Sequence, residues 1–158
     1  MKSAMEWLAN QETVLFLGQS VKDGGTHMGK DFTGIDPDLR IEFPVAEELQ
    51  MGVSIGLALE GFTPVSVYPR WNFLLLAANQ LVNHLDRLPI YSAYCPKVII
   101  RTSVGKARPL DPGPQHQDDF SAAFDAMLRT IEVETGTLKE YKAAYQSTYS
   151  TILVDPCS

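Results

Sequence analysis

The stretch FPVAEELQMGVSIGLALEGF, residues 43–62, is the most informative segment of this 158-residue chain. Its apolar residues are as dense as those of a buried helix, and Gly61 stands where such a helix commonly ends. The pattern therefore predicts a helix over about 45–60. Two adjacent carboxylates, Glu47 and Glu48, occupy its first turn, where a helix entering a core would not ordinarily need acid.

The predicted helix is apolar around its whole circumference. No wide polar face is left between Leu49, Met51, Val53, Ile55, Leu57 and Leu59. A helix of this kind packs on more than one side, and in a chain this short we expect another subunit to provide the second side. Gly52 and Gly56 lie about one turn apart, so a second backbone can approach the helix closely there.

The acidic pair has two interpretations. Both carboxylates can simply favour the helix start, where the helix dipole stabilises a negative charge by about 0.3–1 kcal/mol. Alternatively, one of them is a buried general acid or base whose proton affinity is raised by apolar surroundings. Adjacent helical side chains point about 100° apart, so Glu47 and Glu48 should play different parts.

Short β-rich runs alternate with helical patterns along the chain. The expected strands are 13–17, 41–43, 64–68, 97–102, 130–133 and 151–154. The other expected helices are 4–9, 72–88 (capped by Asn72 and ended before Pro89), 118–128 and 137–145. This alternation, with unbroken apolar strands, predicts an α/β three-layer sandwich: a mostly parallel sheet of about six strands, covered by helices on both faces.

Composition narrows the classes of function. The net charge of −6 argues against a nucleic-acid or anionic-membrane binder, and no apolar run of about 18 residues or cleavable leader is present. Cys95 and Cys157 show no pairing or metal-ligand spacing and are interpreted as a small filler and a tail residue. We expect a single domain over 1–158, cytoplasmic, with no metal site of its own and no membrane contact.

Ligands of open parallel sheets gather at loops beyond the carboxyl ends of the strands. The loops expected at that edge are 18–40, 43–47, 69–73, 103–117 and the segment after 134. They hold nearly every residue considered functional below.

The order and spacing of residues 43–65 resemble the pyrimidine-binding domain of thiamine-diphosphate enzymes. The likeness is greatest to the beta subunit of the pyruvate and branched-chain 2-oxo acid dehydrogenases, and more distant to the central region of transketolase. It continues in LFLGQSV (15–21), QLVNHLDRL (80–88), PQHQ (114–117) and STILVDP (150–156). The resemblance covers about residues 4–156 and implies the thiamine-diphosphate-binding fold.

The resemblance assigns Glu47 to the glutamate that faces the cofactor's aminopyrimidine ring. A proton shared between that carboxyl group and the ring favours the imino tautomer, which can take a proton from the thiazolium carbon and generate a carbanion. Glu48 stands where the family has a small or apolar residue, and we interpret it as a subunit-contact or solvated residue.

Phe73 matches the aromatic residue that stacks on the pyrimidine. With Pro69 and Trp71 it lies in YPRWNF (68–73), a segment placed to form a ligand platform, although Trp71 and Phe73 can also be core or interface aromatics. His116 matches the histidine beside the thiazolium, with a solvated loop residue as the alternative. His27 and His84 have no match, and we expect a polar contact for His27 and a structural or interface role for His84.

Three departures from the family pattern stand out. Gln19 and Ser20 replace acidic residues after the first strand. The loop 103–117 carries Lys106, Arg108 and Asp111 among prolines in place of a glycine-rich run. The family's further C-terminal domain has no counterpart in this sequence.

The superfamily holds the diphosphate and its magnesium with a Gly-Asp-Gly motif on a separate domain, and none occurs here; the nearest string, KDGG, lacks the leading glycine. We therefore expect a diphosphate-binding subunit to provide that half, with thiamine diphosphate at the interface of a homo- or hetero-oligomer. The surfaces expected to be covered are the helix 45–60 and the helix 72–88, which is rich in leucine.

Three functions are compatible with the sequence. The first is the pyrimidine-binding subunit of a split thiamine-diphosphate enzyme acting on a 2-oxo acid or a ketose, with a 2-oxo acid favoured because few polar groups are available for sugar hydroxyls. The second is a non-catalytic assembly or regulatory homologue. The third is an unrelated small α/β binding domain.

Overall fold

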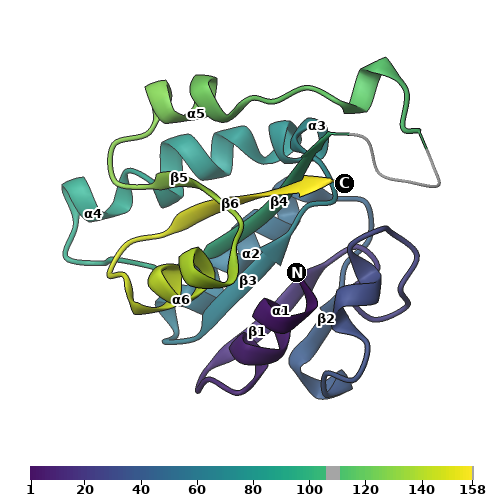
Figure 1. The fold of residues 1–158 in the computed structure, drawn as a ribbon. Coiled ribbons are helices and arrows are strands. Elements are labelled where there is room, and N and C mark those ends of the chain that lie inside the picture. Colours follow the sequence, from purple (N-terminus) through teal and green to yellow (C-terminus); the bar gives the residue numbers. More distant parts are fainter. Residues whose placement is uncertain (106–110, 158) are drawn as a thin grey trace.

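Six parallel strands form one sheet in this computed structural model, which describes residues 1–105 and 111–157. The strands are β1 (Val14–Gly18), β2 (Arg40–Glu42), β3 (Thr63–Val67), β4 (Ile99–Gly105), β5 (Glu132–Thr135) and β6 (Thr151–Cys157). Their order is β2-β1-β3-β4-β6-β5, and every neighbouring pair is parallel (Figure 1). The predicted α/β sandwich with about six strands is confirmed.

Helices cover both faces of this sheet (Figure 1). One face is packed against α1 (Lys2–Ala9), the 3-10 helix η1 (Gly29–Phe32) and α6 (Leu138–Gln146). The other face is packed against α2 (Glu47–Leu59), a helical segment over 71–91 and α5 (Ser121–Met127). Two further 3-10 turns, η2 (Pro37–Leu39) and η5 (Pro114–His116), lie in loops.

The central strands divide their side chains between the two layers. Val65 and Val67 of β3 belong to the core under α1 and α6, whereas Ile100 of β4 and Ile152 of β6 belong to the core under α2 and α5. This alternation follows from the two-residue period of a strand. Because both faces are buried, the strands read as unbroken apolar runs in the sequence.

The segment predicted as one helix over 72–88 is instead a broken helix. It consists of α3 (Trp71–Leu74), the 3-10 turn η3 (Leu75–Ala77), the π-helical turn η4 (Gln80–Leu85) and α4 (Leu88–Tyr91). Asn72 lies inside the first turn and donates a hydrogen bond to Asp118 at 3.4 Å, so it is not the cap. Pro89 does not end the segment, because α4 accepts proline in its first turn.

The helix α2 begins at Glu47 and ends at Leu59, close to the predicted bounds. Gly61, with φ of +92°, follows its end as predicted. No helix in residues 1–105 and 111–157 is long and apolar enough to cross a membrane.

A buried polar side chain fastens the first turn of α2 to the sheet. The amide nitrogen of Gln50 donates to Ser66 Oγ at 3.0 Å and to the carbonyl oxygens of Val67 at 3.1 Å and Leu17 at 3.4 Å. These carbonyls stand at the carboxyl ends of β3 and β1. Ser54 Oγ also contacts Ser66 Oγ, at 3.0 Å. The N-terminus of α2 is therefore held at the edge of the sheet where ligands of such folds bind.

We expect Gln50→Leu to lower the free energy of unfolding by about 1–3 kcal/mol, because leucine keeps the volume but loses the buried hydrogen bonds. Urea denaturation followed by circular dichroism measures the change. Gln146→Leu, at the exposed end of α6, is the matched control and should change stability by less than about 0.5 kcal/mol. Equal effects in the two variants would refute the anchoring role.

Candidate functional site

The two adjacent glutamates of α2 have opposite surroundings. Glu47, the first residue of the helix, is 9% exposed, whereas Glu48 is solvent-exposed. This contrast agrees with the prediction that they play different parts. No described residue donates a hydrogen bond to the Glu47 carboxylate; its backbone carbonyl accepts one from the Tyr68 hydroxyl at 3.4 Å.

The carboxylate of Glu47 acts on its surroundings through its charge. Burial raises the pKa of Tyr68 well above its usual range, and the negative charge of Glu47 raises it further. Tyr68 therefore stays a neutral hydroxyl beside the acid. Glu47 also lies in the first turn of α2, at the end of the helix where the dipole is positive. Glu47 is thus a largely buried residue at the carboxyl edge of the sheet, and its carboxylate has no hydrogen-bond donor among the described residues.

Phe73 and His116, which lie 43 residues apart in the sequence, form a stacked pair. Their ring centroids are 5.2 Å apart and the ring planes meet at 20°. Phe73 belongs to α3, just after β3, and His116 to η5, after β4, so both follow carboxyl ends of strands. The structure thus brings together two of the predicted site residues.

Arg70 holds the backbone around this pair and was not singled out from the sequence. Its guanidinium Nη1 donates to the carbonyl oxygens of Gly105 at 2.7 Å and of His116 at 3.1 Å. Arg70 is 6% exposed, so these hydrogen bonds are shielded from water. They fix the end of β4 and the turn η5 to the start of α3.

The side chains at this edge fit a flat heterocyclic cofactor. The Nδ1 atom of His116 is buried and has no hydrogen-bond partner among the described residues, and Phe73 is only partly buried. Together with the unpartnered carboxylate of Glu47, they provide an aromatic face, an acid and a ring nitrogen. In this conformation one face of Phe73 is covered by the imidazole, so a ligand ring must use the other face or displace His116.

Trp71 and Pro69, also predicted to contact the cofactor, are more deeply buried than Phe73. Trp71 has no exposed surface, and its ring packs on Phe124 with centroids 4.9 Å apart. Trp71 is therefore a core residue, which was the alternative interpretation of this side chain. Pro69 is buried, and its carbonyl oxygen accepts a hydrogen bond from Ser103 Oγ at 2.6 Å.

In two of the segments that depart from the family pattern, the structure shows hydrogen bonds that organise the backbone. In the turn after β1, the backbone N–H groups of Ser20 and Lys22 donate to the carboxylate of Glu42, which organises the turn. In the second loop, Asp111 accepts hydrogen bonds from Gly113 at 3.0 Å and Gln117 at 2.7 Å. Lys106 and Arg108 lie outside the described residues.

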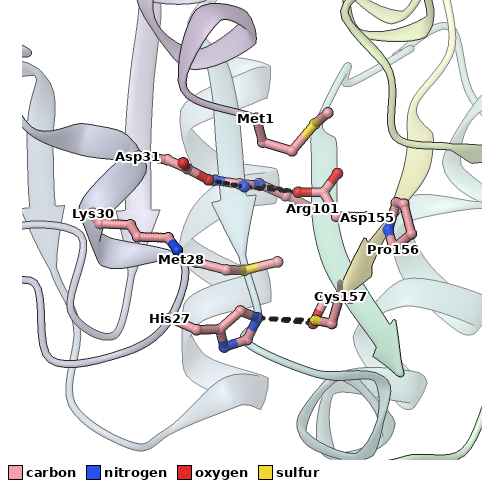
Figure 2. A pocket seen from close by; sticks show the side chains of 10 residues that line it. Met1, His27, Met28, Lys30, Asp31, Arg101, Asp155, Pro156 and Cys157 are labelled. Atoms are coloured by element: carbon pink, nitrogen blue, oxygen red, sulfur yellow. Dashed lines mark hydrogen bonds and ion pairs between the residues drawn. The ribbon is translucent and has the colours of Figure 1, made fainter. Parts of the chain in front are cut away.

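A separate cavity of about 160 Å³ opens at the carboxyl ends of β4 and β6 (Figure 2). The residues around it are Met1, His27, Met28, Lys30, Asp31, Arg101, Ser103, Asp155, Pro156 and Cys157. Arg101, 1% exposed, forms ion pairs with Asp31 and, at 2.7 Å, with Asp155. The Tyr141 hydroxyl donates to Asp155 at 2.9 Å, so the buried carboxylate is also hydrogen-bonded.

His27, Ser103 and Cys157 form a triangle on the wall of this cavity. His27 Nε2 lies 3.1 Å from Ser103 Oγ and 3.4 Å from Cys157 Sγ, and the sulfur lies 3.1 Å from the hydroxyl. The polar contact expected for His27 is confirmed, but no sequence pattern indicated that Cys157 would share it. The parallel register that pairs Ser103 with Asp155 and Gly105 with Cys157 creates this contact. Within the described residues, no group of three or more His, Cys, Asp or Glu side chains is arranged to hold a metal ion.

Comparison with known proteins gives relatives in both sequence and structure. No family model matches the chain. Over 127 residues it is 34% identical to the pyruvate dehydrogenase E1 component subunit beta of Gracilaria tenuistipitata var. liui. That match covers 77% of this chain and 39% of the relative, so the chain spans about two fifths of the relative's length.

Two solved structures share the fold. One, described as "Split gene transketolase, inactive beta4 tetramer", matches with a TM-score of 0.70 and 18% identity, over 99% of this chain and 49% of that chain. The other, a putative thiamin diphosphate-dependent enzyme from Mycobacterium smegmatis, matches with a TM-score of 0.62 and 17% identity, over 98% and 31% of the respective chains. The resemblance predicted from the sequence motifs is confirmed.

We expect the stability of the chain to fall as the pH is lowered from about 6.5 to 4. Burial, followed by the charges of Arg70 and Arg101, lowers the pKa of His27 from 6.5 to about 4. In that window the unfolded chain binds a proton that the folded chain does not, so acid favours unfolding; above pH 6.5 this contribution is constant.

Thermal unfolding of the wild type and His27→Asn between pH 7 and 4 measures the effect. The variant should lose less of its melting temperature across the window. His84→Asn, in which the replaced side chain is exposed on η4, is the control and should keep the wild-type slope. A wild-type slope in His27→Asn would show that the cavity does not disfavour the imidazolium.

Proposed function

We propose that this chain, a relative of the pyruvate dehydrogenase E1 beta subunits with the fold of transketolase-like enzymes, is the pyrimidine-binding subunit of a split thiamine-diphosphate-dependent enzyme. Bound thiamine diphosphate would supply a nucleophilic carbon and an electron sink for decarboxylation and acyl transfer, or for ketol transfer. The chain itself would bind and activate one end of that cofactor. A separate subunit carrying Gly-Asp-Gly would hold the diphosphate and its magnesium.

The observation that carries the proposal is Glu47, a largely buried residue whose carboxylate oxygens remain accessible and accept no hydrogen bond from the described residues. An acid in this position can share a proton with a ring nitrogen brought against it, since no donor in the described part of the chain competes for its oxygens. The anchored first turn of α2 keeps the group in place, so little reorganisation is needed when the ring arrives. Its exposed neighbour Glu48 has no comparable setting.

Phe73 and His116 would complete the site. Phe73 would offer an aromatic face to the pyrimidine, and the imidazole of His116 would offer a ring nitrogen that can donate or accept a hydrogen bond. The orphaned Nδ1 of His116 supports this role, because a ligand atom can pair with it. Because His116 covers one face of Phe73, a ring that stacks on that face would have to shift η5 relative to α3.

The surface of α2 supports the need for a partner. The exposed apolar side chains on or beside α2 and in the segment 71–91 include Val45, Leu49, Val53, Leu75 and Leu76. The helix α2 and the 3-10 turn η3 pack side by side, so these residues lie on the same side of the molecule. Nothing lies within 4 Å of the Cβ position of Gly52 or Gly56, so the approach predicted for a second backbone is open.

A 2-oxo acid is the favoured substrate class. The relative matched in sequence is named for pyruvate dehydrogenase, and ketol transfer would need more polar groups than this edge provides. The second candidate, a non-catalytic assembly or regulatory homologue, is favoured by one observation: His116 covers one face of Phe73, the ring on which a cofactor would stack. Calorimetry with thiamine diphosphate on a reconstituted complex separates the two, because only the first predicts an affinity that falls in Phe73→Ala.

We expect Glu47→Gln to reduce turnover of the reconstituted complex by at least about 100-fold, the usual loss when a general acid or base is removed. The amide keeps the size of the side chain but cannot share the acidic proton. Glu48→Gln is a matched control, one residue away and exposed, and should retain wild-type turnover. Steady-state kinetics with 2-oxo acids measures both. Full activity in Glu47→Gln would remove the basis of the proposal.

We also expect the double variant Leu49→Asp, Val53→Asp to lose self-association and binding to the diphosphate-binding subunit. Two carboxylates on this face would have to be desolvated at the interface. Light scattering after size-exclusion chromatography measures the mass of the assembly. The control is Leu138→Asp, which puts a carboxylate on α6 at the opposite face of the sheet. A double variant that assembles like this control would place the interface elsewhere.

A further inference from the structure

We propose that Arg70 is an anion-binding residue of the candidate site, and that its guanidinium receives the distal carboxylate of a 2-oxo acid that carries two carboxylates. The identity of the substrate rests on the proposed function, whereas the anion site rests on the surroundings of Arg70 alone. Three observations support the site: the residue is nearly buried, its charge has no counter-ion among the described residues, and one edge of its guanidinium is free.

The positive charge of Arg70 is buried without an opposite charge. The residue is 6% exposed, and no carboxylate of the described residues forms an ion pair with it. An arginine at this depth is ordinarily paired, because taking an ion out of water is costly unless an opposite charge compensates it. Arg101, 1% exposed, follows this rule with Asp31 and Asp155. The exception at Arg70 would be removed by an anion that binds there.

The imidazole of His27 is subject to the charge of Arg70. Burial is the largest cause of the low pKa of His27, and the positive charge of Arg70 is the next, followed by the charges of Arg101 and Lys30. Asp31 acts in the opposite direction. Cations therefore dominate the field at this end of β4, although the chain has a net charge of −6. Such a field attracts a small anion.

The guanidinium of Arg70 uses only one of its three nitrogen atoms. Nη1 donates to the carbonyl oxygens of Gly105 at 2.7 Å and His116 at 3.1 Å. Nε and Nη2 donate to no described residue, and neither belongs to the buried polar atoms that lack a partner, so both have access to solvent. Their N–H groups lie side by side along one edge, where a carboxylate can accept with both oxygens. The backbone hydrogen bonds orient this edge before a ligand arrives, which lowers the entropy lost on binding.

This free edge belongs to the candidate site. Arg70 directly precedes α3, which carries Phe73, and its own carbonyl oxygen accepts a hydrogen bond from the Phe73 N–H at 3.1 Å. The bond from Nη1 to the His116 carbonyl joins it to η5, whose imidazole stacks on Phe73. Arg70 is therefore hydrogen-bonded to the backbone of both aromatic residues proposed for the site.

The carboxylate that suits Arg70 is not the one beside the keto group. That group leaves as carbon dioxide when a 2-oxo acid is decarboxylated, so the negative charge moves away from it during the reaction. A cation paired with it would stabilise the substrate more than the transition state and would slow the step. A second carboxylate that does not react keeps its ion pair throughout, so it contributes to affinity and selectivity.

The test compares two acids with the same number of carbon atoms that differ only at one end. 2-Oxoglutarate carries a carboxylate on its terminal carbon, and 2-oxopentanoate carries a methyl group there. Each is titrated into the full chain, and the NMR signals of the arginine Nε–H groups are followed. We expect 2-oxoglutarate to bind at least about tenfold more tightly, the usual gain from hydrogen bonds between charged groups, and to shift the signal of Arg70.

Two variants separate the role of Arg70 from a general effect of charge. Arg70→Met should bring the ratio of the two affinities to about one, because the methyl and carboxylate ends then meet no cation. Arg129→Met removes an exposed guanidinium that precedes β5, at the other end of the sheet, and should keep the wild-type ratio. Arg70→Lys identifies the Arg70 signal by its absence.

Equal affinity of the wild type for the two acids would overturn the proposal, as would a preference for 2-oxoglutarate that survives in folded Arg70→Met. Near-ultraviolet circular dichroism checks the fold of the variant; if it does not fold, the wild-type ratio and the shifted signal decide. Inorganic phosphate is titrated in the same way, and tighter binding than that of 2-oxoglutarate would overturn the assignment to a carboxylate. These titrations contain no cofactor or second subunit, so their outcome is independent of the turnover of Glu47→Gln.

Discussion

The hydrogen bonds of Gln50 are the constraint on which the candidate site depends. They join one helical turn to the carboxyl ends of β1 and β3, so the start of α2 cannot slide or rotate without breaking buried polar contacts. A buried donor left without an acceptor costs about 1–3 kcal/mol, which makes alternative positions of the helix unfavourable. The direction of Glu47, three residues earlier on α2, is a consequence of this attachment.

The same attachment determines which side of α2 is left uncovered. With Gln50, Met51, Ser54 and Ile55 turned to the sheet, the opposite side carries Leu49 and Val53 into solvent. An apolar helix therefore has a polar contact to its own sheet and an apolar surface toward the outside. This arrangement departs from the usual amphipathic pattern of a surface helix, because Met51 and Ile55 on the inner side and Leu49 and Val53 on the outer side are all apolar. It explains why the sequence shows no polar face although the helix is at the surface of this chain.

Much of the fold could be predicted from the sequence, because the strand and helix assignments depend on local periodicity. Strand–helix alternation predicted the parallel sheet, and the angular separation of adjacent helical residues predicted different surroundings for Glu47 and Glu48. The breaks in the segment 71–91 could not be predicted, since single 3-10 and π turns are too short to change the apolar spacing of an otherwise helical segment in a recognisable way. The cluster of His27 and Cys157 was missed because the register of β4 and β6, which the chain order does not encode locally, creates it.

The stacked pair of Phe73 and His116 has an energetic cost in the chain alone. The Nδ1 atom of His116 is buried without a partner, which costs about 1–3 kcal/mol. The two hydrogen bonds from Arg70 to the backbone around the pair oppose a rearrangement that would bring this atom to water. A buried nitrogen without a partner is maintained only when the surrounding contacts hold it in place. Its energetic cost is removed when another group supplies the missing hydrogen bond.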